Sequence, residues 1–334
     1  MKEKSLFFKL EPTFRCNLEC SMCPRFSSQD PRLDMAMATY ERIHEAMRWA
    51  HSVDFTGWGE SMLHKSIAAM IGMAVAKGCR TYLTTNGTVL TERNSLALLG
   101  AGMNHLAVSI DGLTSETFDS LRAGASFTRV SENVRRLSEL ISRMSSPMEL
   151  AIAFTIQEAN AAELDLLIPW MTSVGARVLH LKQLNVISNR DDWQRSFLRY
   201  RLPPVTAGER HLEALEARIL QVIEKGRQEG VQVYMHSELP LSKAMTARHC
   251  IAAPLESAYF SYEGRVAACC HLGHHVSRYM DGSYFPPSAL FFGDIRQQEF
   301  PDIWNSPEFK AFRRGFLDRK YPEACKTCYL LYGK

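Results

Sequence analysis

The sequence predicts an α/β protein: a partial (β/α)6 TIM-like barrel followed by a small cysteine-rich domain. Two observations lead to this prediction. Short apolar, β-leaning runs alternate with longer segments of helical periodicity through the first two-thirds of the chain, as in βα units around a parallel sheet. After Leu239 the pattern changes to short strand-like runs among five cysteines. We therefore expect a barrel domain over residues 1–240 and a second domain over residues 241–334.

The expected barrel elements follow one another regularly. The strands are Leu6–Leu10, Val53–Thr56, Arg80–Thr84, His105–Ile110, Glu149–Ile156 and Arg177–Leu181, and the helices are Tyr40–Ala50, Lys65–Lys77, Glu92–Leu99, Thr128–Ser142 and Ala161–Val174. Six such units favour an open barrel over a closed eight-fold one.

Different elements are expected after these units. An irregular insertion at about residues 187–210 leads into an amphipathic helix, Glu209–Gln228, and one more strand, Val231–His236. Beyond the domain boundary, Ala258–Tyr262 and Arg265–Ala268 flank Glu263-Gly264, which is a hairpin signal.

Composition excludes several classes of partner. The 334 residues are 46% hydrophobic and 22% charged, enough to bury a full core, and the formal charge of +3 is scattered, so nucleic acid is not expected. Neither a run of about 18 apolar residues nor a signal-peptide core occurs, so we expect a cytoplasmic protein without membrane partners. In a reducing compartment, clustered thiols are more often metal ligands or catalytic groups than disulfides.

Three cysteines, Cys16, Cys20 and Cys23, follow the first expected strand with the spacing CxxxCxxC. A loop at the carboxyl end of a strand is where α/β proteins place their sites. Three thiolates can bind three irons of a [4Fe–4S] cluster and leave the fourth iron open to a ligand. A structural zinc site is the alternative, but it needs a fourth ligand, and neither Cys nor His occurs from Pro24 through Ile43.

Here the chain resembles the radical S-adenosylmethionine (SAM) superfamily. The resemblance implies that SAM chelates the open iron and is cleaved reductively to a 5′-deoxyadenosyl radical, which abstracts hydrogen from a substrate C–H bond. It also implies an external one-electron reductant of the flavodoxin or ferredoxin type. The segment Gly57-Trp-Gly-Glu60 is similar to the family's GGE motif, which binds the SAM amino group, although Trp58 departs from the commonest spelling.

Further segments carry the same resemblance. Met22 occupies the position that packs on adenine, the ends of the third and fourth strands are similar to segments that contact ribose and methionine, and Arg122 matches an arginine that pairs with the SAM carboxylate. The implied SAM-binding residues are Met22, Gly57, Gly59, Glu60, Thr85, Asn86, Ser109, Asp111 and Arg122.

The C-terminal cysteines resemble the first half of a SPASM domain in its shortened "twitch" form. Similar too are the segments Phe292–Arg296 and Ile303–Phe309, which typically precede the last cysteines of such domains. The resemblance implies one auxiliary [4Fe–4S] cluster, suited to structure or electron transfer because its four thiolates saturate it. The implied ligands are Cys250, Cys269, Cys325 and Cys328, with tetrahedral zinc as the rival.

Two cysteines remain. Cys270 stands beside Cys269; either could be the ligand, and the spacing from Gly264 favours Cys269. Cys270 is then a candidate hydrogen-atom donor. Cys79 is isolated and expected to be a small buried hydrophobe.

Three outcomes compete for the substrate radical. The leading outcome is oxidation of a small polar metabolite such as a sugar, aminocyclitol or nucleoside, with the auxiliary cluster as electron acceptor. Epimerisation with hydrogen donated by Cys270 is the second, and peptide modification the third, which we expect less because only about five residues precede the first strand. The candidate acid–base and positioning groups at strand ends are Glu158, His180, Lys182, Gln183 and His236. A non-catalytic electron carrier would not need the SAM-binding segments in addition to the cysteines.

Overall fold

A computed structural model describes residues 4–200, 209–237, 239, 241, 250–280, 282–287 and 289–331. Its strands are β1 (Leu6–Leu10), β2 (Ala50–Asp54), β3 (Arg80–Thr85), β4 (His105–Ser109), β5 (Glu149–Ile156), β6 (Val178–Gln183), β7 (Gln232–Met235), β8 (Ser257–Phe260), β9 (Arg265–Ala267), β10 (Arg278–Met280), β11 (Ser283–Phe285) and β12 (Gly293–Asp294). One sheet has the order β12-β9-β8-β1-β2-β3-β4-β5-β6-β7, while β10 and β11 form a separate antiparallel pair. The order has two ends, so among the described strands the sheet is open, as predicted.

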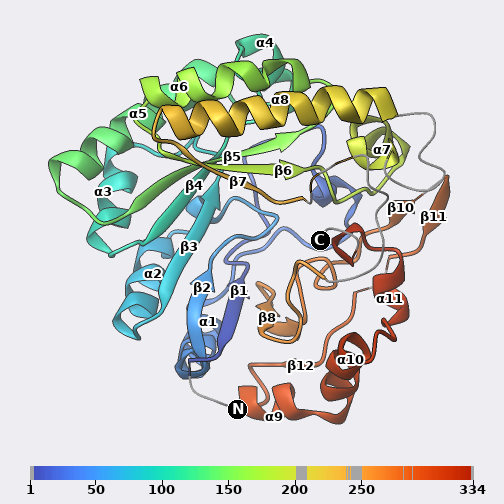
Figure 1. Cartoon of the computed structure of the whole chain (residues 1–334). Coiled ribbons are helices and arrows are strands. Elements are labelled where there is room, and N and C mark those ends of the chain that lie inside the picture. The colour runs from blue at the N-terminus through green and yellow to red at the C-terminus, as the bar shows by residue number, and fades with distance from the viewer. Residues whose placement is uncertain are drawn as a thin grey trace.

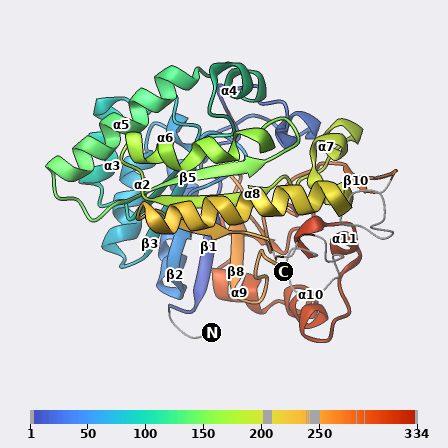
Figure 2. The ribbon, with the colours of Figure 1, turned by 45° about the horizontal axis from the view of Figure 1, so that its top comes forward.

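The helices are α1 (Met37–Ala46), α2 (Ile67–Ala76), α3 (Glu92–Gly100), α4 (Ser115–Leu121), α5 (Phe127–Arg143), α6 (Leu167–Ser173), α7 (Arg190–Arg195), α8 (Glu209–Gln228), α9 (Phe300–Asn305), α10 (Pro307–Leu317) and α11 (Glu323–Lys326). Short 3-10 helices are η1 (Pro24–Ser27), η2 (Met47–Trp49), η3 (Ser61–Leu63), η4 (Ala161–Leu166), η5 (Phe197–Tyr200) and η7 (Tyr329–Leu331). Figure 1 shows α2, α3, α5, α6 and α8 along the strands β2–β7, with α9–α11 gathered at the end of the sheet that carries β8. In Figure 2 helices α5, α6 and α8 run beside one another over β5.

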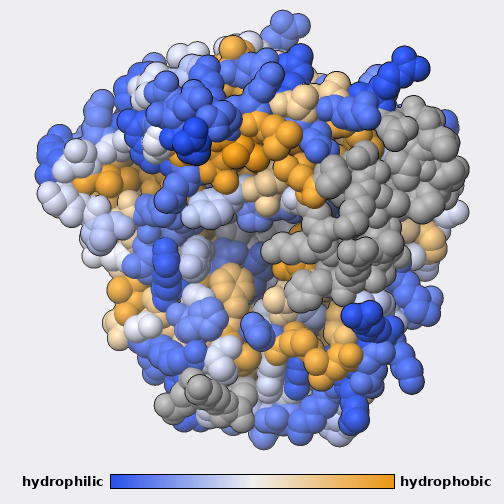
Figure 3. Space-filling model, viewed as in Figure 1, coloured by the Kyte–Doolittle hydropathy of each residue, from blue (hydrophilic) through white to orange (hydrophobic). Residues whose placement is uncertain are grey.

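Helix α8 shows how apolar spacing produces this layer. Leu212, Leu215, Ile219 and Val222 recur every three or four residues and are buried where the helix packs on α6, η4 and β7. Apolar side chains also gather over α8 on the face seen in Figure 3, and Leu220 of that helix is 48% exposed. The helix has the predicted bounds.

The second segment of the chain continues the barrel sheet. Strand β8 pairs in parallel with β1, from Phe7 beside Ser257 to Leu10 beside Phe260. Strand β9 returns antiparallel to β8 through a turn in which Gly264 has a φ of +90°, so the hairpin prediction is confirmed. The division of the chain near residue 240 remains a proposal, and residues 242–249 lie outside the described ranges.

Most barrel elements lie within a few residues of their predicted bounds, with three differences. The predicted helix Tyr40–Ala50 ends at Ala46, because Ala50 pairs with Leu6 and begins β2. Helix α4 was not predicted; it starts at a Thr114 side chain that accepts a hydrogen bond from the Thr117 amide at 3.2 Å.

The third difference is the predicted helix Ala161–Val174, which divides into η4 and α6. Part of the predicted insertion is α7 and η5, and its residues 201–208 are not described. None of the described helices is long and apolar enough to cross a membrane.

Candidate active site

Cys16, Cys20 and Cys23 lie on the loop that leaves the carboxyl end of β1, and all three line one cavity of about 320 Å³. The Cys23 amide donates to the Cys20 carbonyl at 3.1 Å, and the Leu18 amide donates to the Cys16 sulfur at 3.4 Å. Burial raises the pKa of Cys16 and raises that of Cys20 to about 11. Three free thiols on one cavity fit the donor set of a cluster with an open iron.

The same cavity, called the SAM pocket below, brings together every residue predicted to bind SAM. Most come from the ends of successive parallel strands, which meet at one edge of the sheet, while Met22 lies on the cysteine loop and Arg122 at the end of α4. The lining residues include Met22, Gly57, Gly59, Glu60, Thr85, Asn86, Ser109, Asp111 and Arg122.

Glu60 joins two of these strand ends. Its side chain is buried and accepts hydrogen bonds from the Thr85 hydroxyl at 2.8 Å and from the amides of Asn86 and Met62 at 2.7 and 3.0 Å. Burial raises the pKa of Glu60, and these hydrogen bonds act in the opposite direction. Since a carboxylate has about four lone-pair sites, acceptor capacity remains for the amino group of a ligand.

Arg122 is anchored by Asp111 across the pocket wall. The guanidinium donates to one oxygen of Asp111 at 2.9 and 2.6 Å, and the other oxygen accepts from the Thr155 amide at 2.7 Å. Burial disfavours the charge of Arg122, but Asp111 and the nearby thiolates outweigh it and raise its pKa. A guanidinium has five donor hydrogens, so this pairing positions Arg122 while leaving donors for a carboxylate.

The C-terminal cysteines gather beside β8. The Ile251 amide donates to the Leu330 carbonyl at 3.1 Å, which places Cys250 next to the segment that carries Cys325 and Cys328. Burial raises the pKa of Cys250 to about 12, and the charge of Cys328 adds to the rise. Burial likewise raises the pKa of Cys325 to about 12, with Cys328 and Cys250 contributing.

Cys269 and Cys270 differ in their surroundings. Burial raises the pKa of Cys269 well above its usual range, and the neighbouring thiols that add to this are Cys270, Cys328 and Cys250. Burial also raises the pKa of Cys270, but the charges around it are chiefly those of Lys9, Glu11 and Asp54 from the barrel. Both cysteines thus interact with Cys328, and Cys270 in addition lies close to the charged residues of the barrel.

These thiols fit an iron–sulfur cluster by their chemistry. Cys250, Cys269, Cys325 and Cys328 are free thiols that are buried or half-buried. Four such sulfur donors suit a [4Fe–4S] cluster. Among the described residues no three His, Cys, Asp or Glu side chains converge closely enough to hold a single metal ion. A cubane does not require this, because each thiolate binds its own iron.

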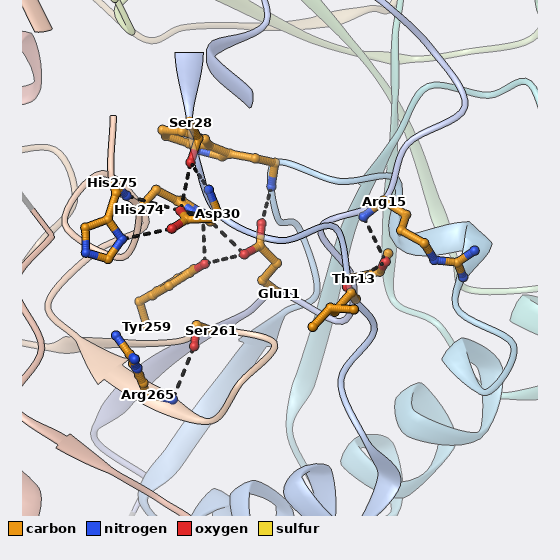
Figure 4. Close-up of polar contacts among 12 residues, drawn as sticks. Glu11, Thr13, Arg15, Ser28, Asp30, Tyr259, Ser261, Arg265, His274 and His275 are labelled. Carbon is orange, nitrogen blue, oxygen red and sulfur yellow. Dashed lines mark hydrogen bonds and ion pairs between the residues drawn. The ribbon is translucent and has the colours of Figure 1, made fainter. Parts of the chain in front are cut away.

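A buried polar network joins the cysteine loop to β8 (Figure 4). Glu11 accepts hydrogen bonds from the Trp58 amide and from the Tyr259 hydroxyl, both at 2.7 Å. His274 lies 3.2 Å from Glu11 through one ring nitrogen and 3.1 Å from Asp30 through the other. The Trp58 ring stacks on His274 with centroids 4.2 Å apart. The network therefore holds the segment after β2 against the C-terminal part of the chain.

A second cavity of about 580 Å³ lies between the two groups of cysteines and is called the central cavity below. Lys182, Gln183 and Asn185, at the end of β6, line both this cavity and the SAM pocket. Cys269 and Cys270 line its other side. A molecule bound in the central cavity therefore has the SAM pocket at one end and the C-terminal cysteines at the other.

The predicted acid–base groups divide between this cavity and other surroundings. Lys182, Gln183 and His236 line the central cavity. His180 lies 3.0 Å from His236 between ring nitrogens, and burial, aided by the charges of His236 and Lys182, lowers the pKa of His180 to about 3. Glu158 is not among the residues of either cavity and forms an ion pair with Arg199 at 2.8 Å.

Sequence reasoning missed four polar residues of the site region: Lys9, Glu11, Tyr259 and His274. One signal was available, because Lys9 is the charged residue in an otherwise apolar strand, Leu6–Leu10. The other three acquire their roles only from contacts across more than 200 positions of the chain.

Comparisons with known proteins agree with this geometry. The radical SAM superfamily model matches residues 10–152, and the SPASM model, described as an iron–sulfur cluster-binding domain, matches residues 250–329. A tungsten-containing aldehyde ferredoxin oxidoreductase cofactor-modifying protein of Pyrococcus furiosus is 22% identical over 97% of this chain and 87% of its own length. An AdoMet-dependent heme synthase of Oleidesulfovibrio alaskensis is 24% identical over 95% of this chain and 78% of its own length.

The fold is shared with solved structures as well. Streptococcus suis SuiB bound to the precursor peptide SuiA superimposes with a TM-score of 0.67 at 14% identity, over 99% of this chain and 71% of SuiB. Fold and site together define the class as an enzyme that uses SAM with iron–sulfur clusters. A radical SAM domain and a C-terminal SPASM domain are therefore both detected in the chain. The predicted family, fold and cofactors are confirmed.

Proposed function

We propose that this enzyme oxidises a small polar metabolite at a C–H bond. The observation that supports this is the central cavity, which borders the SAM pocket at Lys182 and Gln183 and the auxiliary cysteines at Cys269 and Cys270. When bound, SAM and its [4Fe–4S] cluster would supply the radical chemistry that removes one hydrogen atom from the substrate, and one auxiliary [4Fe–4S] cluster would take the remaining electron while the proton leaves to solvent.

The residues of the chain divide the remaining tasks. Glu60 and Arg122 would orient SAM through its amino and carboxylate groups, and the close packing of Gly59 on the cysteine loop keeps this end of the pocket rigid. The SAM-binding cluster would be held by Cys16, Cys20 and Cys23, and the auxiliary cluster by Cys250, Cys269, Cys325 and Cys328.

The names of the relatives widen the substrate class. Two of the relatives that match over nearly the whole chain are named for a cofactor and for heme. A cofactor or its precursor therefore joins sugars, aminocyclitols and nucleosides as a candidate substrate. The electrons for SAM cleavage would come from a reductant of the flavodoxin or ferredoxin type.

The first test is the reconstituted protein with SAM and dithionite, followed by chromatography. We expect 5′-deoxyadenosine, and with a substrate of this class a product that has lost two hydrogens. If no 5′-deoxyadenosine formed while both clusters were intact, the proposed activity would be wrong. A Cys16→Ala variant is the matched negative control.

Epimerisation is a second candidate because Cys270 lines the central cavity, where the positive charge of Lys9 acts on its thiol. In that case the thiol would return a hydrogen atom to the substrate radical, and the product would keep the substrate's mass. Turnover in D₂O discriminates, since an epimerised product carries solvent deuterium and an oxidised product is lighter. With Cys270→Ala, loss of product while 5′-deoxyadenosine still forms supports epimerisation; unchanged product formation removes it.

A further inference from the structure

Two lysines from opposite sides of the barrel line the central cavity: Lys9 of β1 and Lys182 of β6. The Lys9 ammonium lies 3.5 Å from a carboxylate oxygen of Asp54. Within the described part of the chain, the Lys182 ammonium has no hydrogen-bonding or ion-pair partner. One of the two ammonium groups therefore has an ion-pair partner, and the other has none within the described residues.

The unmatched charge is held at a cost. Burial and repulsion from Lys9 lower the pKa of Lys182, and the attraction of Asp54 and Asp111 does not offset this. A desolvated ammonium without a counter-charge destabilises a folded protein unless a bound anion compensates it. Such a charge at the wall of a cavity is typical of a binding group rather than of a stabilising one.

The neighbour of Lys182 shows the same lack of partners. Gln183 is 5% exposed, and neither its amide nitrogen nor its amide oxygen has a hydrogen-bonding partner among the described residues. Buried amides are nearly always hydrogen-bonded in folded proteins. Because Gln183 lines both cavities, a polar ligand at their junction would complete its hydrogen bonds.

Two carboxylates attract the Lys182 ammonium, but each has another ion-pair partner, Lys9 for Asp54 and Arg122 for Asp111. Glu256 is the acidic residue of the cavity lining and is exposed to solvent. Within the described part of the chain, the cavity wall therefore carries one ammonium group without an ion-pair partner, and such a group attracts anions.

We propose that the substrate carries an anionic oxygen group, a carboxylate or a phosphate, which Lys182 and Lys9 bind at the junction of the central cavity and the SAM pocket. The inference rests on the proposed function and narrows its substrate class to sugar acids, nucleotides and carboxylate-bearing cofactor precursors. The anion is held where Lys182 and Gln183 border both cavities, so it lies next to the end of the substrate that faces the SAM pocket.

The test uses the reconstituted holoenzyme with saturating SAM, titrated calorimetrically with inorganic phosphate, with glutarate and with the neutral analogue glutaramide. We expect saturable binding of phosphate or glutarate, which identifies the anion type, and no binding of glutaramide. Lys182→Met should lower the affinity for the anion at least about tenfold, which corresponds to the loss of one hydrogen bond to a charged group. Lys310→Met, which removes an exposed lysine of α10, should leave it unchanged.

Thermal unfolding supplies an independent readout. Because Lys182→Met removes a desolvated ammonium without an ion-pair partner, the unfolding midpoint of the variant should equal or exceed that of the wild type. Weaker binding can then not be attributed to misfolding. Lys9→Met is the second variant and should weaken the same anion.

Three results would overturn the proposal: no saturable binding of either anion, unchanged affinity in Lys182→Met, or a loss of SAM affinity with anion binding intact. The last would place Lys182 in the SAM site instead. If the anions bound but no 5′-deoxyadenosine formed with both clusters intact, this inference would stand and the proposed activity would be wrong.

Discussion

Gly59 is the residue at which the segment after β2 comes closest to the cysteine loop. A methyl group there would lie 2.2 Å from the Thr13 carbonyl oxygen and 2.7 Å from the Arg15 carbonyl oxygen. Both atoms belong to the backbone, so the loop that carries the cluster thiolates would have to shift. We predict that Gly59→Ala weakens SAM binding at least about tenfold, measured by equilibrium binding to the reconstituted protein.

Gly100→Ala is the control, because a methyl group on Gly100 would meet nothing within 4 Å. Its SAM affinity should match that of the wild type. Equal SAM affinities in the two variants would show that the close approach at Gly59 has no part in shaping the pocket.

At the scale of elements, the buried network of Glu11, Tyr259, His274 and Asp30 connects the loop after β1 to β8 and to the turn that follows the paired cysteines. Its central group is charged. Burial lowers the pKa of His274, but Glu11 and Asp30 outweigh this and raise it to about 9. Two carboxylates and one imidazolium thus stabilise one another out of water.

This shift predicts a pH dependence of stability. An unfolded histidine has a pKa of about 6.5, so between about 6.5 and 9 the folded protein binds more protons than the unfolded chain. The stabilisation by His274, up to about 3 kcal/mol, is complete below this window and is lost as the pH rises through it. We expect the thermal unfolding midpoint to fall from pH 6.5 to 9, and to fall less in His274→Gln.

The matched control is His275→Gln, since His275 contacts the same Asp30 at 2.8 Å but is about half exposed. That variant should keep the pH dependence of the wild type. An identical pH dependence in His274→Gln would contradict the charged state assigned to His274.

At the scale of the whole molecule, the two cysteine groups come from different parts of the chain: the N-terminal group lines the SAM pocket, and Cys269 and Cys270 line the neighbouring central cavity. We predict that Cys325→Ala lowers the iron content by about half, because one of two four-iron groups loses a ligand. Formation of 5′-deoxyadenosine should persist, since the SAM pocket is untouched, while the oxidised product falls. Iron analysis and chromatography measure these quantities.

Cys79→Ala is the control for this experiment. Cys79 is buried, with 4% of its surface exposed, as expected for a small hydrophobe. Its sulfur contacts the Lys4 ammonium and the carbonyls of Met47 and Ala50. Its removal should leave the iron content unchanged. Full iron content in Cys325→Ala would show that Cys325 is not a cluster ligand.

The sequence by itself determined what depends on short stretches of chain. Strands β1 and β5 and helix α8 have their predicted bounds, because side-chain periodicity decides which face of an element is buried. The residues predicted for SAM line one pocket because most of them lie at the ends of parallel strands, and such strand ends meet at one edge of the sheet. Element ends were less predictable where pairing overrode helical spacing, as at Ala50 beside Leu6.

Only the tertiary structure decided which distant groups share an environment. Lys9 and Lys182 are 173 positions apart, and the curvature of the sheet between β1 and β6 brings both to one cavity. There the Lys9 ammonium forms an ion pair with Asp54, whereas within the described residues the Lys182 ammonium has no ion-pair partner. The different surroundings of Cys269 and Cys270 likewise follow from the pairing of β8 with β1. Electrostatic and hydrogen-bonding partners act over a few ångströms of space, whatever their separation along the chain, and local pattern does not record that distance.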